Sequence, residues 1–595
     1  MEAWTFGLAV VAVHLAALNW SYPKVGPDYE LFFPRYLDTL IYVLNNGLFS
    51  IQWWTPSFLG GFVSYPNPQF TQFILPQILT LWLSPWLAVN LIYALFLLLG
   101  YFCVYLLLRR SLFLPHPVAL TGAAIYSTTA FYLHHIAAGH ITFHVYHLLP
   151  VLLYVYYHGS WSGLTKTLLY AFVSAYFVYA GGYNLAIIFA MSFTITVLSL
   201  RVLLGRRILG WKWPTLPVGL GLGALLSLSK LHAVYLLTRF LPRKTGDIYT
   251  SSLKNALLGL FHQLFTTPLV TIAGDFQPHS DSNIADILKR AIGTIWGLHE
   301  IDIGVSPLIL FILFIALCLG ARTWFGPDRS RSQGRKAPWS IWALLGLCLW
   351  LSVELCIAKG PLYHIVKSLP FFKSLRVNLR NAAIFVLPLT VLSAHLTARL
   401  SFVVPPRLIR ILPVLALAWF AAYIDIPAKT NYTFDVSHLE RDWDDIVHRD
   451  RPFAISRIEN DYEYQFYDKQ ASCLKTEETL ILDNNIHFPL FVGESVWRVE
   501  AGQANMMHPA GYIFPRENGV EFLDRITIDD PNLPLFLENK ETSWRISRSQ
   551  AICDRISLAL FLLLSAVIAG KTIHRLGGLK FFGHGRPTGP SWEDA

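Results

Sequence analysis

Charged residues are scarce in this chain. They make up 14% of its 595 residues, against roughly 25% in an ordinary soluble domain. Hydrophobic residues make up 54%, which is more apolar surface than a soluble core can bury. Lipid is therefore the expected solvent for most of the chain.

The sequence also lacks the common nucleotide-binding and hydrolase motifs. It contains no glycine-rich phosphate-binding loop, no dinucleotide fingerprint and no serine nucleophile elbow. These absences argue against a cytosolic nucleotide-sugar or ATP as the substrate. It contains no internal repeat either, which weighs against transporter folds built from two matching halves.

Cysteine is rare, with six in the whole chain. Four lie in apolar runs and are expected to be small buried hydrophobes, namely Cys103, Cys318, Cys348 and Cys356. Cys473 and Cys553 flank one long polar segment. They could form a disulfide if that segment faces an oxidising compartment, or both could be free thiols.

About twelve apolar runs are long enough to predict transmembrane helices. They lie near residues 4–20, 87–108, 118–135, 143–157, 166–181, 184–204, 214–237, 303–321, 339–358, 381–398, 408–425 and 555–570. The first run has no basic n-region and no cleavage site, so it predicts a first span and not a removed signal peptide. The stretch 70–86 is broken by Pro76 and Pro85, which favours an interfacial or re-entrant piece.

The net charge of +9 comes from short basic clusters between these runs. That placement is typical of membrane orientation signals and not of nucleic-acid binding. Alternate loops differ: one set is short and basic, and the other is long and mixed or acidic, at 21–86, 238–302, 359–380 and 426–554. The positive-inside rule then predicts the second set outside and both termini in the cytoplasm.

We therefore expect an α-helical polytopic membrane protein in three parts. Residues 1–425 form a transmembrane domain with its external loops, 426–554 form a small external α+β domain, and 555–595 form the last span and a cytoplasmic tail. The α+β expectation rests on short strand-like runs between turn signals, at 495–500 and 519–523.

The first external loop carries a candidate catalytic carboxylate. Asp28 follows the first span closely, and partial desolvation at headgroup depth would suit a general base. The alternative interpretation is that Asp28 caps a short interfacial helix.

Cations in the external loops are the second candidate group. Lys230 interrupts an apolar run, which is costly without a partner. Arg376 and Arg380 are four residues apart and would share one helix face. Because external cations oppose the positive-inside trend, an anion such as a lipid phosphate would explain them. Snorkelling to anionic headgroups is the alternative, and it is preferred for Lys367 and Lys373.

Five histidines cluster where the predicted spans 118–135 and 143–157 meet, at His134, His135, His140, His144 and His147. The last three would share a helical face and could ligate a divalent metal. No cysteine or carboxylate completes a ligand set nearby, so polar packing at the membrane surface is the preferred interpretation.

The order of several short motifs resembles a known family. Asp28 is followed by Trp54-Thr-Pro, Gly60-Gly61, Pro66-Asn-Pro-Gln69, Gly139-His140, Gly181-Gly-Tyr-Asn184, Leu228-Ser-Lys-Leu-His232, Pro242-Arg243, His299-Glu300 and the run 369–380. Each piece is short, and the shared order carries the likeness. In this respect the chain is similar to the YfhO-like bacterial membrane proteins, within the wider GT-C class of glycosyltransferases.

The resemblance implies an inverting transferase in the bacterial cytoplasmic membrane, acting at the external face. It would take a sugar from a polyprenyl-phosphate donor and pass it to a glycan, glycolipid or protein acceptor. Asp28 would be the catalytic residue, and the donor phosphate would be bound by Lys230, Arg243, Arg376 and Arg380.

Substrate contacts implied by the same resemblance fall on Glu30, Gln69, His140, His232 and Glu300. Glu30 alone stands near Asp28 where the family has a further acidic residue. No metal ligand is therefore assigned, while a divalent metal stays possible. A transporter or lipid-linked-sugar flippase is the competing interpretation, and a membrane scaffold is the third.

Overall fold

The computed structural model describes residues 2–18, 24–26, 28–56, 62–204, 214–240, 260–266, 302–325, 346–348, 350–351, 354–355, 360–369, 372, 379–400, 404–431, 434–435, 439–448, 455–458, 464–466, 471–472, 502–522 and 524–581. Cys473 and most of the predicted span 339–358 lie outside these residues.

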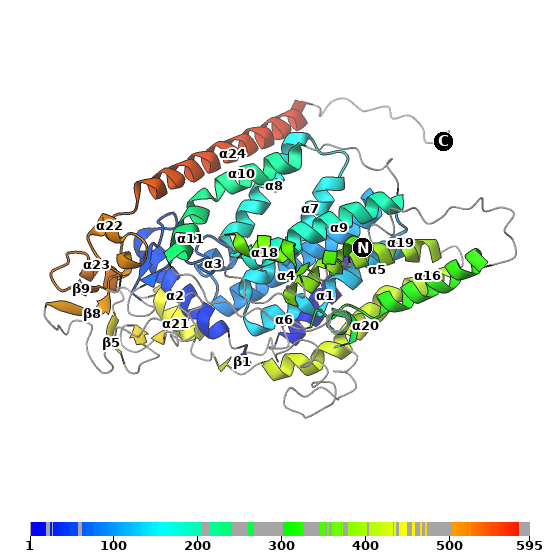
Figure 1. Cartoon of the computed structure of the whole chain (residues 1–595), viewed down its shortest axis with the longest axis horizontal. Helices are drawn as coiled ribbons and strands as arrows, with labels where there is room; N and C mark the ends of the chain where they lie inside the picture. The colour runs from blue at the N-terminus through cyan, green and yellow to red at the C-terminus, as the bar shows by residue number, and fades with distance from the viewer. Residues whose placement is uncertain are drawn as a thin grey trace.

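Helices dominate the described chain, and they coincide with the predicted apolar runs. They are α1 (Glu2–Ala17), α4 (Pro85–Leu106), α5 (His116–Ser127), α6 (Ala130–Ala138), α7 (Leu148–Tyr157), α8 (Gly163–Tyr179), α9 (Ala186–Leu204), α10 (Thr215–Leu226), α11 (Leu228–Phe240), α16 (Leu308–Phe325), α19 (Val386–Leu400), α20 (Pro406–Asn431) and α24 (Arg548–Phe581). In Figure 1, α24 and α10 lie side by side along the upper edge.

Five of the described helical stretches are long and apolar enough to cross a membrane. They are Pro85–Ser111, Gly182–Val202, Arg380–Leu400, Pro406–Tyr423 and Arg548–Thr572. The pair α10 and α11 would make a sixth span, and α1 and the stretch Ile141–Tyr157 are apolar but shorter. The chain is therefore a helical membrane protein, while the number of twelve spans stays a prediction.

Two expected spans are interrupted, each beside a hydroxyl residue. The expected span 214–237 bends by 66° between α10 and α11, where Ser227 Oγ donates to the carbonyl of Gly223 at 2.8 Å. The expected span 118–135 stops between α5 and α6, where Thr128 Oγ1 donates to the carbonyl of Ala124 at 2.7 Å. Such back-bonding competes with the helical ladder and bends helices.

The loops predicted to lie outside contact one another. Strand β1 (Lys24–Val25) pairs antiparallel with β4 (Phe434–Asp435), and Asn45 Nδ2 donates to the carbonyl of Glu538 at 2.7 Å. At the other end of the helices, Glu2 pairs with His116 at 2.9 Å. These contacts join parts of two loops predicted outside and two segments predicted inside, while the topology stays a prediction.

The first external loop contains an amphipathic helix, α2 (Tyr29–Asn46). It buries Tyr29, Phe32, Phe33 and Tyr36 among the transmembrane helices. No apolar run marks it in the sequence, because Glu30, Arg35 and Asp38 interrupt the hydrophobic residues. Short strands β2 (Trp54–Thr55) and β3 (Phe62–Val63) form a hairpin later in the same loop.

The segment predicted as an external α+β domain holds short strands and helices. Its described elements are α21 (Leu439–His448), β5 (Ile455–Ile458), β6 (Tyr464–Phe466), β7 (Ala471–Ser472), β8 (Gln503–Met507), α22 (Pro515–Asn518), β9 (Arg525–Thr527) and α23 (Leu533–Leu537). Strands β8 and β9 pair antiparallel, as do β5, β6 and β7. The helices α20 and α24 extend past the predicted boundaries at 426 and 554.

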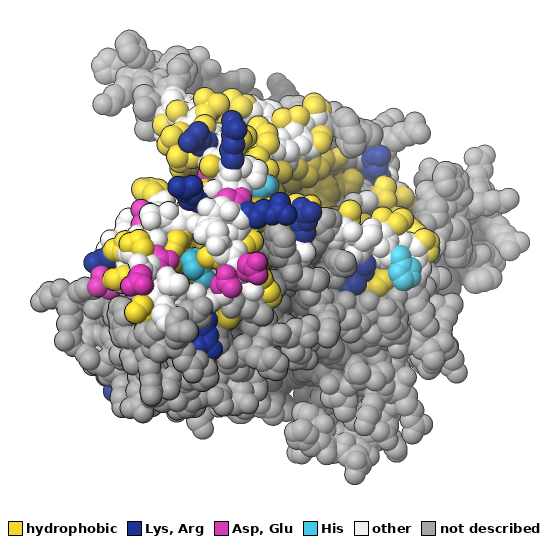
Figure 2. Space-filling view, turned by 60° about the vertical axis from the view of Figure 1, so that its left-hand side comes forward, with side chains coloured by type: hydrophobic (Ala, Val, Ile, Leu, Met, Phe, Trp, Pro, Cys, Tyr) yellow, Lys and Arg dark blue, Asp and Glu magenta, His cyan; other side chains and the backbone are white. Residues whose placement is uncertain are grey.

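The later part of this segment packs against the first external loop. Rings of Trp53 and Phe514 lie 5.8 Å apart, and those of Trp54 and Trp544 lie 5.4 Å apart. Figure 2 brings this end forward and shows acidic, basic and hydrophobic side chains mixed over its described surface. The segment is thus continuous with the transmembrane core at this face.

Candidate functional site

The backbone around Asp28 is docked on the end of helix α6. The amide of Asp28 donates to the carbonyl of Ala138 at 2.9 Å. Gly139 closes α6 with φ of 109°, and a Cβ there would lie 2.5 Å from the amide nitrogen of Tyr29 and 2.8 Å from Asp28 Cβ. Glycine is required at 139 because both the backbone conformation and the close approach exclude a side chain.

The side chain of Asp28 pairs with His140. Oδ2 of Asp28 lies 2.5 Å from Nε2 of His140, and the two side chains are 33% and 15% exposed. Asp28 occupies the N-cap position of α2 but makes no capping hydrogen bond with its side chain. The alternative interpretation is thus confirmed for the position of Asp28 at the start of a helix, while no capping hydrogen bond from its side chain is present. The carboxylate is held by a histidine and still reaches solvent.

A second histidine extends this pair into the protein. Nδ1 of His140 lies 2.7 Å from Nδ1 of His135, and the His135 side chain is fully buried. If His140 donates its Nε2 proton to Asp28 and is neutral, His135 must donate from Nδ1. Phe143 stacks on His135 at 3.9 Å and on His140 at 5.4 Å, which fixes both rings.

Arg380 reaches the same cluster from a distant part of the chain. It lies in η7 (Leu379–Phe385), and its guanidinium carbon is 5.4 Å from the centroid of the Phe143 ring. Phe143 is therefore the shared neighbour of Arg380 and His140. Asp28, His140, His135, Phe143 and Arg380 are called the Asp28 cluster below.

Several predicted site residues lie outside the described residues. They are Arg243, Glu300 and Arg376. Glu30 belongs to helix α2, and only its backbone is described. The expectations for these four side chains stay predictions.

Gln69 lies on a loop that packs beside the segment following His140. Gly181 approaches this loop closely, since a Cβ there would lie 2.9 Å from the carbonyl of Pro68 and 3.2 Å from Cγ2 of Thr142. Oε1 of Gln69 is buried and has no hydrogen-bond partner among the residues that the structure describes.

Lys230 has a structural role that differs from the expected phosphate contact. Its side chain is 1% exposed, and Nζ donates to the carbonyls of Tyr65, Asn67 and Phe70 at 2.6, 2.9 and 2.8 Å. An ammonium group has three donors, so all of them are used. Lys230 holds the loop that carries Gln69, and we withdraw it from the donor-phosphate set.

His232 likewise contacts protein and not the Asp28 cluster. Its Nδ1 lies 2.8 Å from Oε1 of Gln550 on α24. Gln550 Nε2 donates to Asp554 at 2.7 Å, and Ser229 donates to the same carboxylate at 2.7 Å. This network joins α11 to α24, so these contacts give His232 a packing role.

A buried histidine–aspartate pair that was not predicted from the sequence lies beside the Asp28 cluster. His134 Nε2 lies 3.0 Å from Oδ2 of Asp302 and 3.2 Å from the hydroxyl of Tyr423. Burial raises the pKa of the Asp302 carboxyl, and the hydrogen bond from His134 opposes that shift. The spacing of 168 residues between the partners left no local signal for this contact.

The remaining histidines diverge from one another. His144 donates or accepts at Tyr176, 2.8 Å away, and the ring of His147 packs 4.1 Å from that of Tyr132. Within the described residues there is no group of three or more side chains that could hold a metal ion. Polar and aromatic packing accounts for these two rings.

No family model, curated protein or solved structure matches the chain. The geometry of the Asp28 cluster and the motif order described above are therefore the observations that bear on the function of the chain.

Proposed function

We propose that the chain is a membrane glycosyltransferase that moves a sugar from a polyprenyl-phosphate donor to a glycan, glycolipid or protein acceptor. One observation carries the proposal: a solvent-reaching carboxylate, Asp28, is oriented by His140, and the cation of Arg380 adjoins the same ring cluster. Inverting transfer needs a base for the acceptor and a cation for the leaving phosphate, and both are present here.

In the proposed reaction, Asp28 takes the proton of the acceptor hydroxyl. The hydroxyl oxygen forms a bond to the anomeric carbon, and the bond from that carbon to the phosphate oxygen breaks with its electron pair. The charge on the leaving lipid phosphate grows from about −1 toward −2. Arg380 would stabilise this growing charge more in the transition state than in the ground state.

His140 and His135 act on Asp28 and not on the substrate in this scheme. The hydrogen bond from His140 fixes one carboxylate oxygen and favours the ionised form. Gln69, on the loop held by Lys230, keeps its proposed role as a contact to a sugar hydroxyl.

The proposed location is the external face of a bacterial cytoplasmic membrane, with both termini inside. The convergence of the segments around Asp28, Ala138, Gly181, Gly304 and Arg380 at one end supports this placement. The proposal leaves room for a divalent metal. Loss of transfer after addition of a chelator would reveal one.

The test uses the purified full-length protein in lipid nanodiscs with a labelled polyprenyl-phosphate sugar. Transfer of label to an acceptor, lost in Asp28→Asn and kept in Asp444→Asn, supports the proposal. Asp444 is a suitable control because it is a carboxylate with 63% exposure on α21. Movement of intact donor across the bilayer of proteoliposomes, with no transfer in either protein, would instead establish a flippase.

A further inference from the structure

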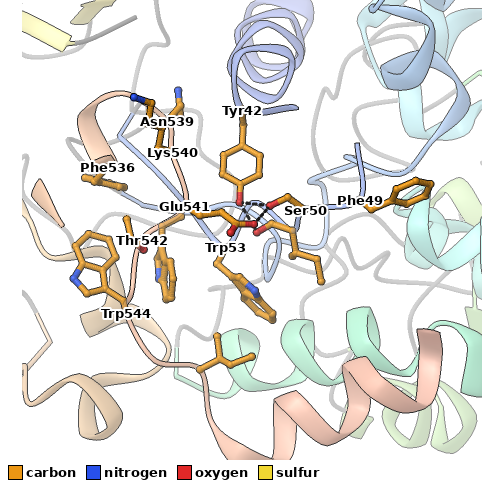
Figure 3. Close-up of a pocket in the computed structure, with 13 residues that line it drawn as sticks. Tyr42, Phe49, Ser50, Trp53, Phe536, Asn539, Lys540, Glu541, Thr542 and Trp544 are labelled. Carbon is orange, nitrogen blue, oxygen red and sulfur yellow. Dashed lines mark hydrogen bonds between the residues drawn. The ribbon is translucent and has the colours of Figure 1, made fainter. Parts of the chain in front are cut away.

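A cavity of about 380 Å³ lies between the first external loop and the segment after α23. Its walls come from residues 42–54 and 536–546 (Figure 3). That volume falls in the range of roughly 300–1,000 Å³ found for small-ligand sites. None of the residues of the Asp28 cluster lines it, so it is separate from the proposed catalytic site.

Hydrogen bonds between the two walls hold the cavity open. Asn46 Nδ2 donates to the carbonyl of Asn539 at 2.7 Å, and the amide of Glu541 donates to Asn46 Oδ1 at 2.9 Å. Asn539 has φ of 52°, and its side chain donates to the buried Asp38 at 3.0 Å. The two walls are therefore joined to each other by hydrogen bonds without any ligand.

Aromatic rings dominate the lining of the cavity. Trp53, Trp544 and Phe536 surround it in Figure 3, and Trp54 and Phe49 also line it. Phe49 is 85% exposed, although burying a phenylalanine ring is favourable by roughly 1.5–3 kcal/mol. Flat apolar ring faces suit a ligand that presents apolar C–H groups on one face.

Polar groups stand among these rings. The hydroxyl of Tyr42 lies 2.8 Å from Ser50 Oγ, and Ser50 donates to the carboxylate of Glu541. These three side chains meet near the centre of Figure 3. Burial raises the pKa of Tyr42 to about 12, so its hydroxyl keeps its proton at neutral pH.

The charge of the lining selects against an anion. Lys540 and Glu541 both line the cavity. The positive charge of Lys540 is paired with Glu538 at 2.6 Å, so the negative charge of Glu541 is the one that a ligand meets. A phosphate or a phospholipid headgroup would be repelled by Glu541, and a lipid chain would leave the polar groups unpaired.

We propose that this cavity binds an uncharged saccharide. A sugar ring combines an apolar C–H face, which packs on Trp and Phe rings, with hydroxyls that can hydrogen-bond with Tyr42, Ser50 and Glu541. Binding of a saccharide in this cavity does not depend on transfer chemistry at Asp28.

The test measures binding of chitotetraose, maltotetraose and cellotetraose to the full-length protein. Nanodiscs are used because maltoside detergents carry a saccharide that would compete. Three tryptophans line the cavity, so binding should change the intrinsic tryptophan fluorescence in a saturable way, and calorimetry should give the same Kd.

Variants then locate the site. Glu541→Gln should weaken binding roughly tenfold or more, because hydrogen bonds to charged groups contribute about 1.5–3 kcal/mol. Phe49→Ala should weaken it about threefold to tenfold; its ring is exposed, so the fold should tolerate the change. Phe113→Ala, which removes a 79% exposed ring elsewhere, should leave Kd unchanged.

Three outcomes would overturn the inference. The first is that no tetrasaccharide binds to protein whose thermal unfolding is normal. The second is that a tetrasaccharide binds with the same Kd to the wild type, Glu541→Gln and Phe49→Ala. The third is that inorganic phosphate or a phospholipid headgroup displaces the sugar through this cavity.

Discussion

Asp28 and His140 face each other with 2.5 Å between Oδ2 and Nε2, although one precedes helix α2 and the other follows helix α6. The approach depends on Gly139, whose backbone lets the two segments touch. Replacing Asp28 by Asn should keep the fold, because a partly exposed pair contributes about 1 kcal/mol or less. Transfer should fall by about a hundredfold or more, since the base is lost.

The measurement for Asp28→Asn is initial rate at saturating donor, with unfolding temperature recorded in parallel. A second variant, His140→Gln, should reduce the rate less than Asp28→Asn, because it removes only the group that orients the carboxylate. Full activity in Asp28→Asn would refute the assignment of the base.

Arg380→Ala should lower kcat by about a hundredfold to a thousandfold if Arg380 stabilises the leaving phosphate. Arg380→Lys should recover part of the rate, because the charge is kept and the planar fork is lost. Kinetics with varied donor and fixed acceptor measure the effect. Lys367→Ala removes a cation from α18 (Pro361–Ser368) and serves as the matched control; an equal loss in both variants would contradict a specific role.

Gly139→Ala should damage the site more than the same change at Gly519. Both glycines end a helix with positive φ, 109° and 66°, and forcing alanine into that region costs about 1–2 kcal/mol. Only at 139 would the new Cβ also meet the backbone of Asp28 and Tyr29, while 519 is open. Activity per folded protein should therefore fall in Gly139→Ala and persist in Gly519→Ala.

Lys230→Met should destabilise the protein and leave the donor KM of any folded fraction unchanged. The variant leaves the buried carbonyls of Tyr65, Asn67 and Phe70 without the hydrogen-bond donor Nζ. Each buried unpaired group costs about 1–3 kcal/mol. The unfolding temperature measures the loss. A normal unfolding temperature combined with a raised donor KM would restore the phosphate-binding role.

Asp442 should make the stability of the protein fall as pH rises. Burial raises the pKa of this carboxyl from its ordinary 3.8 to about 7. Between these values the folded protein holds a proton that the unfolded chain releases, so the stabilising contribution is complete below about pH 4 and is lost toward pH 7.

Unfolding temperatures recorded from about pH 3 to about pH 8 measure this dependence, because that interval contains both pKa values. Asp442→Asn should flatten the curve, because the amide does not titrate. Asp444→Asn, on the same helix but exposed, should leave the wild-type slope. The helix matters for the site because Trp443 Nε1 donates to the carbonyl of Thr80 at 2.7 Å, which joins α21 to the first external loop.

Much of the helical framework was predictable from local sequence. Apolar runs predicted the positions of α4, α9 and α24. A helix in lipid makes all its backbone hydrogen bonds internally, and the length of its apolar run must match the thickness of the bilayer. Helix α2 was not predicted, since its charged residues mask a face that only packing reveals. The bend at Ser227 also escaped the hydropathy pattern, which does not register one hydroxyl.

The candidate site was predictable in part. The sequence predicted Asp28 as a base and His140 as a substrate contact. Nothing in their spacing along the chain indicated that the two side chains pair with each other. Lys230 was recognised as costly in an apolar run, but its partners are backbone carbonyls, which carry no sequence signature. The cavity at Glu541 escaped notice because its walls are about 490 residues apart, a separation seen in the Ser50–Glu541 contact.

The sequence by itself determined that this chain is helical and belongs in lipid, because hydrophobicity is a sum over local residues and needs no knowledge of contacts. The tertiary structure alone decided which carboxylate meets which histidine, which lysine holds a loop and where a cavity opens. Those outcomes depend on side chains brought together from distant positions, and the free energy of each pairing exists only after the helices have packed.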